Sequence, residues 1–119
     1  MSIIENFIQG DTLEIPLIFE EEQTDGSFLP IDITNWTIWF TVKSDPRDID
    51  DDAIIGPIEV TVHTDPVNGK TLISISKEQT NIPVKDNYWY DLQTKDAAGA
   101  INTIEVDNLD CLQGVTHTN

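Results

Sequence analysis

The stretch "DNYWYDLQTKD", residues 86–96, places three consecutive aromatic residues at the start of a run that alternates between two kinds of side chain. A period of two is typical of a β-strand with one buried face. Tyr88 and Tyr90 then point to one side, and Trp89 points to the other. The stretch therefore predicts a strand that packs two tyrosines into a core and leaves a tryptophan on the opposite face.

Similar alternating runs, separated by turn-forming residues, recur roughly every ten residues, and none has helical spacing over more than about two turns. Asn68-Gly69 in particular predicts a hairpin between the run before it and the run after it. The pattern as a whole predicts an all-β fold, an immunoglobulin-like antiparallel β-sandwich of seven to eight strands. The runs expected to be strands are 12–22, 35–45, 53–65, 71–79, 88–96 and 101–109.

Alternation also predicts which side chains of these runs face the core. In the first run Ile15 and Leu17 should point inward, and Pro16, which cannot donate to a ladder, indicates a free strand edge. In the run 53–65 Val62 should face the core and His63 should face solvent.

The two tyrosines fit a feature of immunoglobulin-type sandwiches. There, a tyrosine at the start of one strand donates a hydrogen bond to the connection before it, two residues ahead of the second cysteine of the domain. Tyr88 falls at that corner position, and Tyr90 falls where the cysteine would lie. Cys111 is the only cysteine, so no internal disulfide can form and aromatic packing has to fill the centre.

Trp39 and Trp89 have a different potential role. Trp39 shares the mostly polar face of the run 35–45, and Trp89 shares the outward face of the run 88–96. Both can fall on one solvent face, where aromatic rings would offer a platform for a sugar or a receptor. A carbohydrate- or receptor-binding module is therefore the alternative to a purely structural role.

The charge of the chain excludes several partners. Twenty-two acidic residues face six Lys and Arg, for a formal net charge of -16. This opposes binding to nucleic acid and to anionic membrane surfaces, and it favours solubility or docking to a basic neighbour. The N-terminal sequence lacks the basic region of a signal peptide, and no run approaches the roughly twenty apolar residues of a membrane span. We expect a protein made in a cytoplasm.

The acidic run "DIDDDAIIGPIE" has part of the spacing of an EF-hand calcium loop. Asp48, Asp50 and Asp52 match ligand positions of that pattern, but Ala53 lies where the loop needs glycine. The flanking runs also predict strands rather than helices. A solvated acidic loop is the favoured interpretation, and the three aspartates are a weak calcium candidate.

No arrangement in the sequence predicts catalysis. His63 and His117 have no nucleophile or carboxylate at a recognised spacing, and Ser74 lies in no nucleophile-elbow motif. Zinc ligation would need a Cys/His cluster, which the chain lacks. We therefore expect no enzyme and no cofactor.

Four short segments occur together in a recognisable order: Gly10-Asp11-Thr12, the strand 36–43, Asn68-Gly69-Lys70 and Tyr88-x-Tyr90-Asp91. Their order resembles the small immunoglobulin-like structural proteins of tailed bacteriophages, including the N-terminal module of the upper baseplate protein family, over residues 9–105. The resemblance implies a non-enzymatic building block of a virion, located in the baseplate, tail, fibre junction or neck as an adaptor or decoration subunit. Its partners would be other virion proteins, and it would form a homo-oligomer or assemble on a symmetric partner.

We expect one domain over residues 1–119. The segments 1–8 and 111–119 are either the first and last strands of the sandwich or docking arms that add to a neighbour. The first alternative is slightly favoured.

Overall fold

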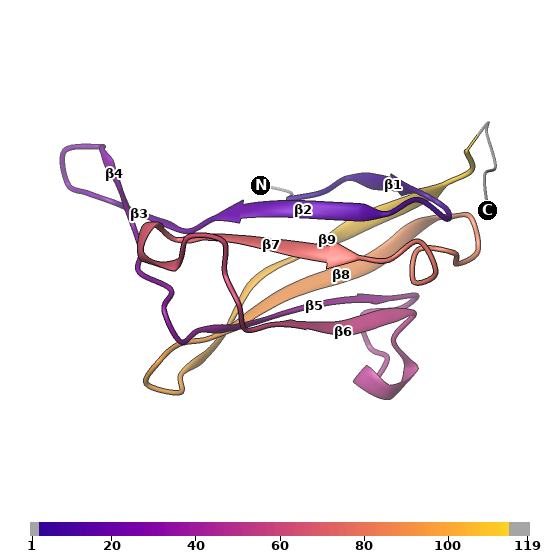
Figure 1. Cartoon of the computed structure of the whole chain (residues 1–119). Helices are drawn as coiled ribbons and strands as arrows, with labels where there is room; N and C mark the ends of the chain where they lie inside the picture. Colours follow the sequence, from indigo (N-terminus) through magenta and orange to yellow (C-terminus); the bar gives the residue numbers. More distant parts are fainter. Residues whose placement is uncertain (1–2, 115–119) are drawn as a thin grey trace.

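The computed structural model describes residues 3–114, and strands make up most of the secondary structure in this range (Figure 1). Within it, the helical elements are two 3₁₀ turns, Asp50–Asp52 and Pro66–Asn68, and no helix is long and apolar enough to span a membrane. His117 lies outside the described residues. The nine strands of this range are β1 (Asn6–Ile8), β2 (Leu13–Ile18), β3 (Glu20–Glu22), β4 (Phe28–Pro30), β5 (Thr37–Lys43), β6 (Ile55–Val60), β7 (Lys70–Ile75), β8 (Lys85–Lys95) and β9 (Ile101–Leu112).

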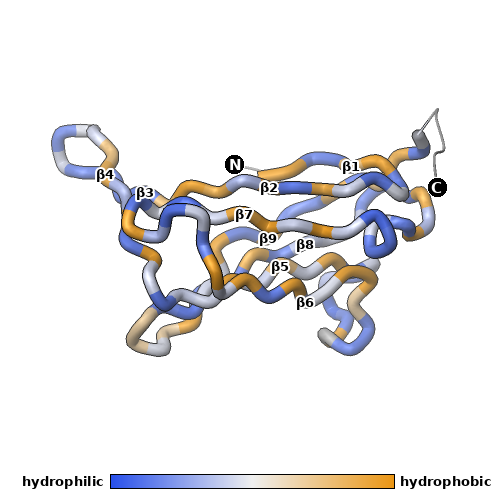
Figure 2. The backbone as a smooth tube through the Cα atoms, in the orientation of Figure 1, coloured by the Kyte–Doolittle hydropathy of each residue, from blue (hydrophilic) through white to orange (hydrophobic). Residues whose placement is uncertain are grey.

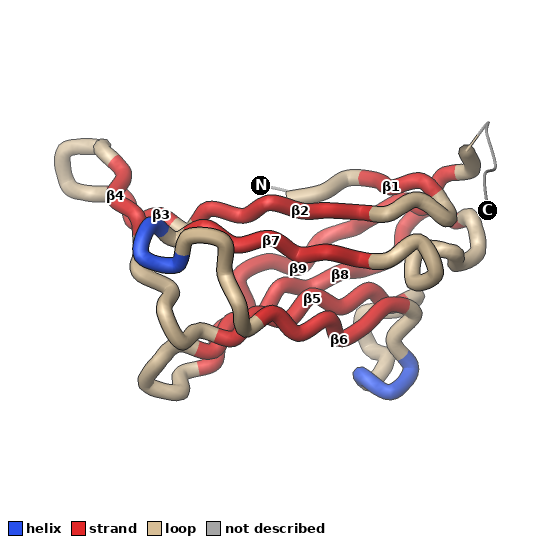
Figure 3. Tube along the Cα trace, viewed as in Figure 1, coloured by secondary structure: helices blue, strands red, loops and turns tan. Residues whose placement is uncertain are grey.

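The strands form three sheets (Figure 3). The largest has the order β1-β9-β8-β5-β6 and is antiparallel except for the parallel pair β1 and β9. β2 pairs with β7, and β3 pairs with β4. The expectation of a β protein without a disulfide is confirmed, with Cys111 buried and free. Nine strands exceed the expected seven to eight, because the run 12–22 divides into β2 and β3, and β4 lies outside every expected run.

One apolar core joins the five-stranded sheet to the sheet of β2 and β7. On β2 the alternation predicted the inward side chains correctly: Ile15 and Leu17 are buried, and Glu14, Pro16 and Ile18 beside them are exposed. The alternation is visible along the chain in Figure 2. From the facing sheet, the rings of Phe40 and Tyr90 meet with their centroids 5.5 Å apart. As Pro16 indicated, β2 pairs on one side only within residues 3–114, with β7.

The first described residues pack on their own chain. Phe7 in β1 is only 4% exposed, and Ile3 and Ile4 pack against the core. At the other end of the chain, residues 111–112 complete β9, and Cys111 is fully buried.

The turn at Asn68-Gly69 exists, but the expectation of a hairpin was wrong. The strands on either side, β6 and β7, belong to different sheets, and a single bridge between Asp65 and Lys70 closes the turn. Pro66 starts the 3₁₀ turn, and Gly69 ends it with a φ of 73°. The turn therefore carries the chain from one sheet to the other, where β7 finds its partner in β2.

The expectations for Val62 and His63 were also wrong. β6 ends at Val60, so the alternation stops there and Val62 is 86% exposed. The His63 ring turns inward, with Nε2 2.8 Å from the Trp36 carbonyl oxygen and Nδ1 2.8 Å from the Thr71 hydroxyl. Because a carbonyl can only accept, Nε2 carries the proton in the neutral ring and Nδ1 accepts from Thr71. His63 thus links the residue before β5 to β7.

Candidate functional site

The candidate site is the outer face of the five-stranded sheet, the side turned away from the core. Its centre is formed by alternate residues of β5 and β8 that pair across the two strands: Trp39 with Gln93, and Thr41 with Asp91. Trp89 lies further along, opposite Lys43. At about 3.3 Å per residue, the two tryptophan positions are about 13 Å apart along the sheet. The structure thus places Trp39 and Trp89 on one face, as the sequence suggested.

The outer face is apolar at its margin and open to solvent. Both tryptophans are half-buried, and Thr41 between them is only 4% exposed. On the neighbouring strand β9, Ile101 and Val106 expose 59% and 56% of their surface. Apolar side chains of this size are more often covered than left in water, so the face resembles a contact surface.

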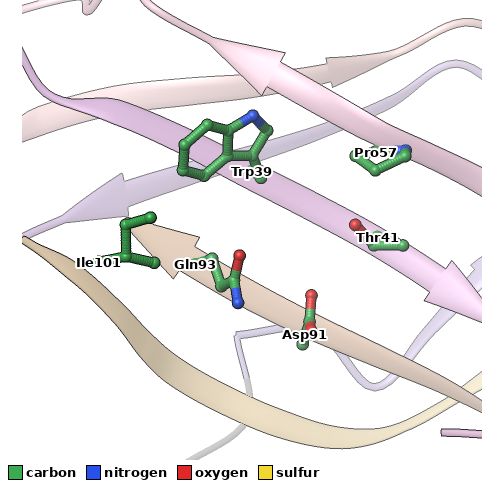
Figure 4. Close-up of a pocket in the computed structure, with 6 residues that line it drawn as sticks. All are labelled: Trp39, Thr41, Pro57, Asp91, Gln93 and Ile101. Carbon is green, nitrogen blue, oxygen red and sulfur yellow. The ribbon is translucent and has the colours of Figure 1, made fainter. Parts of the chain in front are cut away.

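Two shallow hollows lie side by side on this face. The first has a volume of about 270 Å³ and is drawn in Figure 4. The second, near Trp89, has a volume of about 100 Å³. They share Thr41 and Asp91, and each is smaller than the roughly 300–1,000 Å³ of a typical small-molecule pocket. The residues lining the first are Trp39, Thr41, Pro57, Asp91, Gln93 and Ile101; those lining the second are Thr41, Lys43, Pro46, Trp89, Tyr90, Asp91 and Val106.

The local fold explains how Pro57 joins the first hollow. The register of β5 and β6 shifts between Phe40 and Val42, so that Gly56 and Pro57 both lie opposite Thr41. Gly56 has a φ of 81°, and a Cβ there would lie 2.7 Å from the Phe40 carbonyl oxygen. Glycine is therefore required at this irregularity, and the residue after it comes to the outer face.

The polar groups in the first hollow lie on β5 and β8. The Gln93 amide and the Asp91 carboxylate are on β8, and the Thr41 hydroxyl is on β5 (Figure 4). Gln93 Nε2 donates a weak hydrogen bond to Thr103 Oγ1 at 3.4 Å. Aromatic, aliphatic and hydrogen-bonding groups on one shallow surface can contact either protein side chains or a sugar ring.

Tyr88 and Tyr90 lie on the opposite, inner side of the sheet. The Tyr88 hydroxyl donates a hydrogen bond to the Pro83 carbonyl oxygen, five residues earlier in the chain, at 2.7 Å. Burial raises the pKa of Tyr88, so its hydroxyl stays protonated as a donor. Both rings are almost fully buried and cannot contact a partner.

A polar cluster around Glu105 was missed by the sequence analysis. Its Oε2 accepts from the Tyr90 hydroxyl at 3.0 Å and from the Ile3 backbone N–H at 3.2 Å. The cluster ties the start of the chain to β8 and β9. An available signal was that Glu105 falls on the inward side of its strand, where an unpaired carboxylate is costly.

The acidic loop gives no support for a metal centre. Asp48 Oδ2 accepts from the Asp45 backbone N–H at 3.3 Å, and the Asp48 carbonyl accepts from Lys43 Nζ at 2.8 Å. Among the residues that the structure describes, no group of three or more His, Cys, Asp or Glu is placed to hold a metal ion. The side chain of Asp50 is outside that part, so calcium binding by Asp48, Asp50 and Asp52 stays a prediction.

Comparison with known protein-family models gave no match to this chain, and comparison with curated proteins also gave none.

Proposed function

We propose that this protein is a non-enzymatic structural protein that acts by binding neighbouring proteins through its outer face. The observation that carries the proposal is the difference in burial between the two faces of the five-stranded sheet. The inner face is packed against the core, whereas the outer face keeps four large side chains in contact with solvent: Trp39, Trp89, Ile101 and Val106. Tryptophan is enriched at protein interfaces, and shallow apolar surfaces suit another protein better than a small substrate.

We further propose that the fold is an immunoglobulin-like β-sandwich. In that fold one sheet contains the neighbours G, F, C and C′, and the other contains B beside E. The order β9-β8-β5-β6 and the pair β2 and β7 fit this scheme strand for strand. The Tyr88 hydrogen bond to Pro83 supports the same assignment.

The particle that we propose is the virion of a tailed bacteriophage. The support is the order of the four segments at residues 10–12, 36–43, 68–70 and 88–91, which resembles the upper baseplate protein family and related phage proteins. The protein would be made in the host cytoplasm and join other virion proteins, as a homo-oligomer or on a symmetric partner. A net charge of -16 would limit self-aggregation before assembly.

The test has two parts. Mass spectrometry of purified particles should detect the protein, and its absence would end the virion proposal. Co-sedimentation of the purified protein with particles that lack it should then fail for a Trp39→Ser, Trp89→Ser variant. A matched control, Val62→Ser with Val67→Ser, changes exposed apolar residues away from the outer face and should sediment like the unmodified protein. Equal sedimentation of all three proteins would contradict a role for the outer face.

A second candidate function is carbohydrate or receptor-glycan binding. It is favoured by the polar groups of Asp91 and Gln93 beside the Trp39 ring (Figure 4). A glycan array should then give a signal that is lost in the Trp39→Ala, Trp89→Ala double variant and also in the Gln93→Met variant. If the face binds a protein instead, Gln93→Met should keep binding, because methionine keeps the volume and the apolar contact of Gln93. Silence of the unmodified protein on the array would count against this function.

A further inference from the structure

The strands β3 and β4 form a hairpin that extends away from the rest of the molecule (Figure 1). Among the described strands they pair only with each other, and all six of their residues are exposed. A two-stranded hairpin without a third strand or a packed face is marginally stable in water. This hairpin therefore needs contacts beyond its own strand pairing to hold its conformation.

The base of the hairpin supplies part of that order. The Phe19 backbone N–H donates to the Gly69 carbonyl at 2.8 Å, and the Ile31 N–H donates to the Phe19 carbonyl at 3.0 Å. The Phe19 ring packs against Trp36 with centroids 5.8 Å apart. These contacts fix the direction in which the hairpin leaves the body.

The turn at its tip is also well defined. The Gln23 N–H donates to the Ser27 carbonyl at 2.7 Å, and Gly26 adopts a φ of 86°. Asp25 Oδ1 accepts from the Ser27 N–H and hydroxyl at 2.9 and 2.6 Å. A hairpin ordered at both ends holds its two strands in a fixed geometry.

The strands carry two large apolar side chains that the described chain leaves more than half exposed. Phe28 and Leu29 expose 58% and 55% of their surface. The register places Phe28 beside Glu22 and Leu29 beside Glu21, so each face of the hairpin combines an apolar side chain with a carboxylate. Large apolar residues on an ordered, projecting element mark an interaction site.

Charge identifies the kind of partner. Residues 20–30 include Glu20, Glu21, Glu22 and Asp25 but no Lys or Arg, in a chain of net charge -16. A second copy would bring the same carboxylates together, and like charges at an interface are costly. A surface with Lys or Arg around an apolar hollow would instead match both features of the hairpin.

We propose that the β3–β4 hairpin is a docking element for a different protein of basic surface, which buries Phe28 and Leu29 and pairs its Lys or Arg with Glu20–Glu22. This deepens the proposed function, on which it rests, by naming the element and the chemistry of one partner. It is separate from the outer face, so the two contacts can be tested independently.

Zero-length carbodiimide cross-linking of the whole protein tests this directly, because it joins carboxylates to lysine amines in contact. It is applied to purified particles and to the lysate of the cells that assemble them, with mass spectrometry of the products. We expect the peptide containing residues 20–22 to be joined to lysines of another protein. A Phe28→Ser, Leu29→Ser variant keeps all the carboxylates and should lose at least about tenfold of this product, which corresponds to 1.4 kcal/mol.

Charge is tested by co-sedimentation of a Glu20→Gln, Glu21→Gln, Glu22→Gln variant, which should bind at least tenfold more weakly. The control is Glu14→Gln, Glu78→Gln, Asp86→Asn, which removes the same charge from exposed positions elsewhere and should bind like the unmodified protein. Thermal melting of every variant should match the parent, since all substituted residues are exposed. Equal loss in both charge variants would reduce the effect to net charge and overturn the proposal.

The remaining outcomes separate the two proposals. Cross-links from residues 20–22 to a second copy of this chain would overturn a basic partner. Loss of sedimentation on changing the tryptophans, without hairpin cross-links, would overturn the docking role and leave the proposed function standing. If this protein is absent from purified particles but its hairpin cross-links to a basic protein in the lysate, the docking role is supported and the virion proposal is overturned.

Discussion

The two faces of the five-stranded sheet are built by the same strands and differ in almost every physical respect. On the inner face, Phe40 and Tyr90 are at most 1% exposed and pack against each other. On the outer face, their chain neighbours Trp39 and Trp89 are only half-buried, around a shallow polar floor. The difference teaches that burial on one side supplies the folding energy and leaves large aromatic residues on the other side available for contact. Substitutions should therefore separate stability from binding.

The largest expected effect is on the inner face. Tyr90→Ala removes a buried ring and should lower the free energy of unfolding by about 3–5 kcal/mol, a large share of the roughly 5–15 kcal/mol of a typical domain. Urea unfolding followed by circular dichroism measures it. Trp89→Ala, one residue away, is the control and should cost clearly less, because its ring is half-solvated. Equal losses in the free energy of unfolding would mean that the outer face stabilises the fold as much as the inner face does.

A smaller effect is expected at Gly69, in the turn that carries the chain from β6 in one sheet to β7 in the other. Gly69→Ala places a Cβ 2.4 Å from the Phe19 carbonyl oxygen at a positive φ of 73°, so we expect a loss of roughly 1–3 kcal/mol. The control, Gly99→Ala, has a φ of 93° but no atom within 4 Å, and should suffer only the backbone strain. The same urea titration compares them. A larger loss at Gly99 would show that the close packing at Gly69 is unimportant.

Alternation predicted the inner faces because burial imposes it residue by residue. Ile15, Leu17 and Tyr90 are buried where the period of two places them. The shared outer position of Trp39 and Trp89 also follows from alternation, once β5 and β8 are neighbours. The sequence could therefore locate most of the candidate site without defining its hollows.

The predictions that were wrong concern features that depend on contacts between residues far apart in the sequence. Asn68-Gly69 predicted a turn, but local turn chemistry does not determine that β7 pairs with β2 instead of β6. The run 12–22 was expected to be one strand, but it divides into β2 and β3, and β3 pairs with β4 outside both larger sheets. His63 was misplaced because the alternation was extended beyond Val60, where tertiary hydrogen bonds take over.

A third prediction concerns the hydrogen bond that Tyr88 donates to the connection before β8. Tyr88→Phe keeps the buried ring and removes only the bond to the Pro83 carbonyl, so the loss should be about 0.5–1.5 kcal/mol. It should be well below the loss in Tyr90→Ala, because burying a whole ring stabilises the fold more than one hydrogen bond does. Urea unfolding again gives the value. A loss as large as that of Tyr90→Ala would show that this hydrogen bond, and not packing, dominates the inner face.

The smallest effect is expected outside both faces, at Asp45 just after β5. Arg47 donates to its carboxylate through Nη2 at 2.8 Å and Nε at 3.1 Å, and these hydrogen bonds lower the pKa of Asp45 from 3.8 to about 2. Because the pKa is lower in the folded state, the stabilisation is fully present above pH 3.8 and is lost as the pH falls toward 2. Because the Arg47 side chain is 88% exposed and that of Asp45 is 39% exposed, solvent screens the pair, and the effect on unfolding should be small. Carboxyl carbon NMR should show the Asp45 pKa rising in Arg47→Gln, while that of Asp25, which is lowered by Ser27, stays unchanged. An unchanged Asp45 would mean that the loop backbone, and not the arginine, holds the carboxylate.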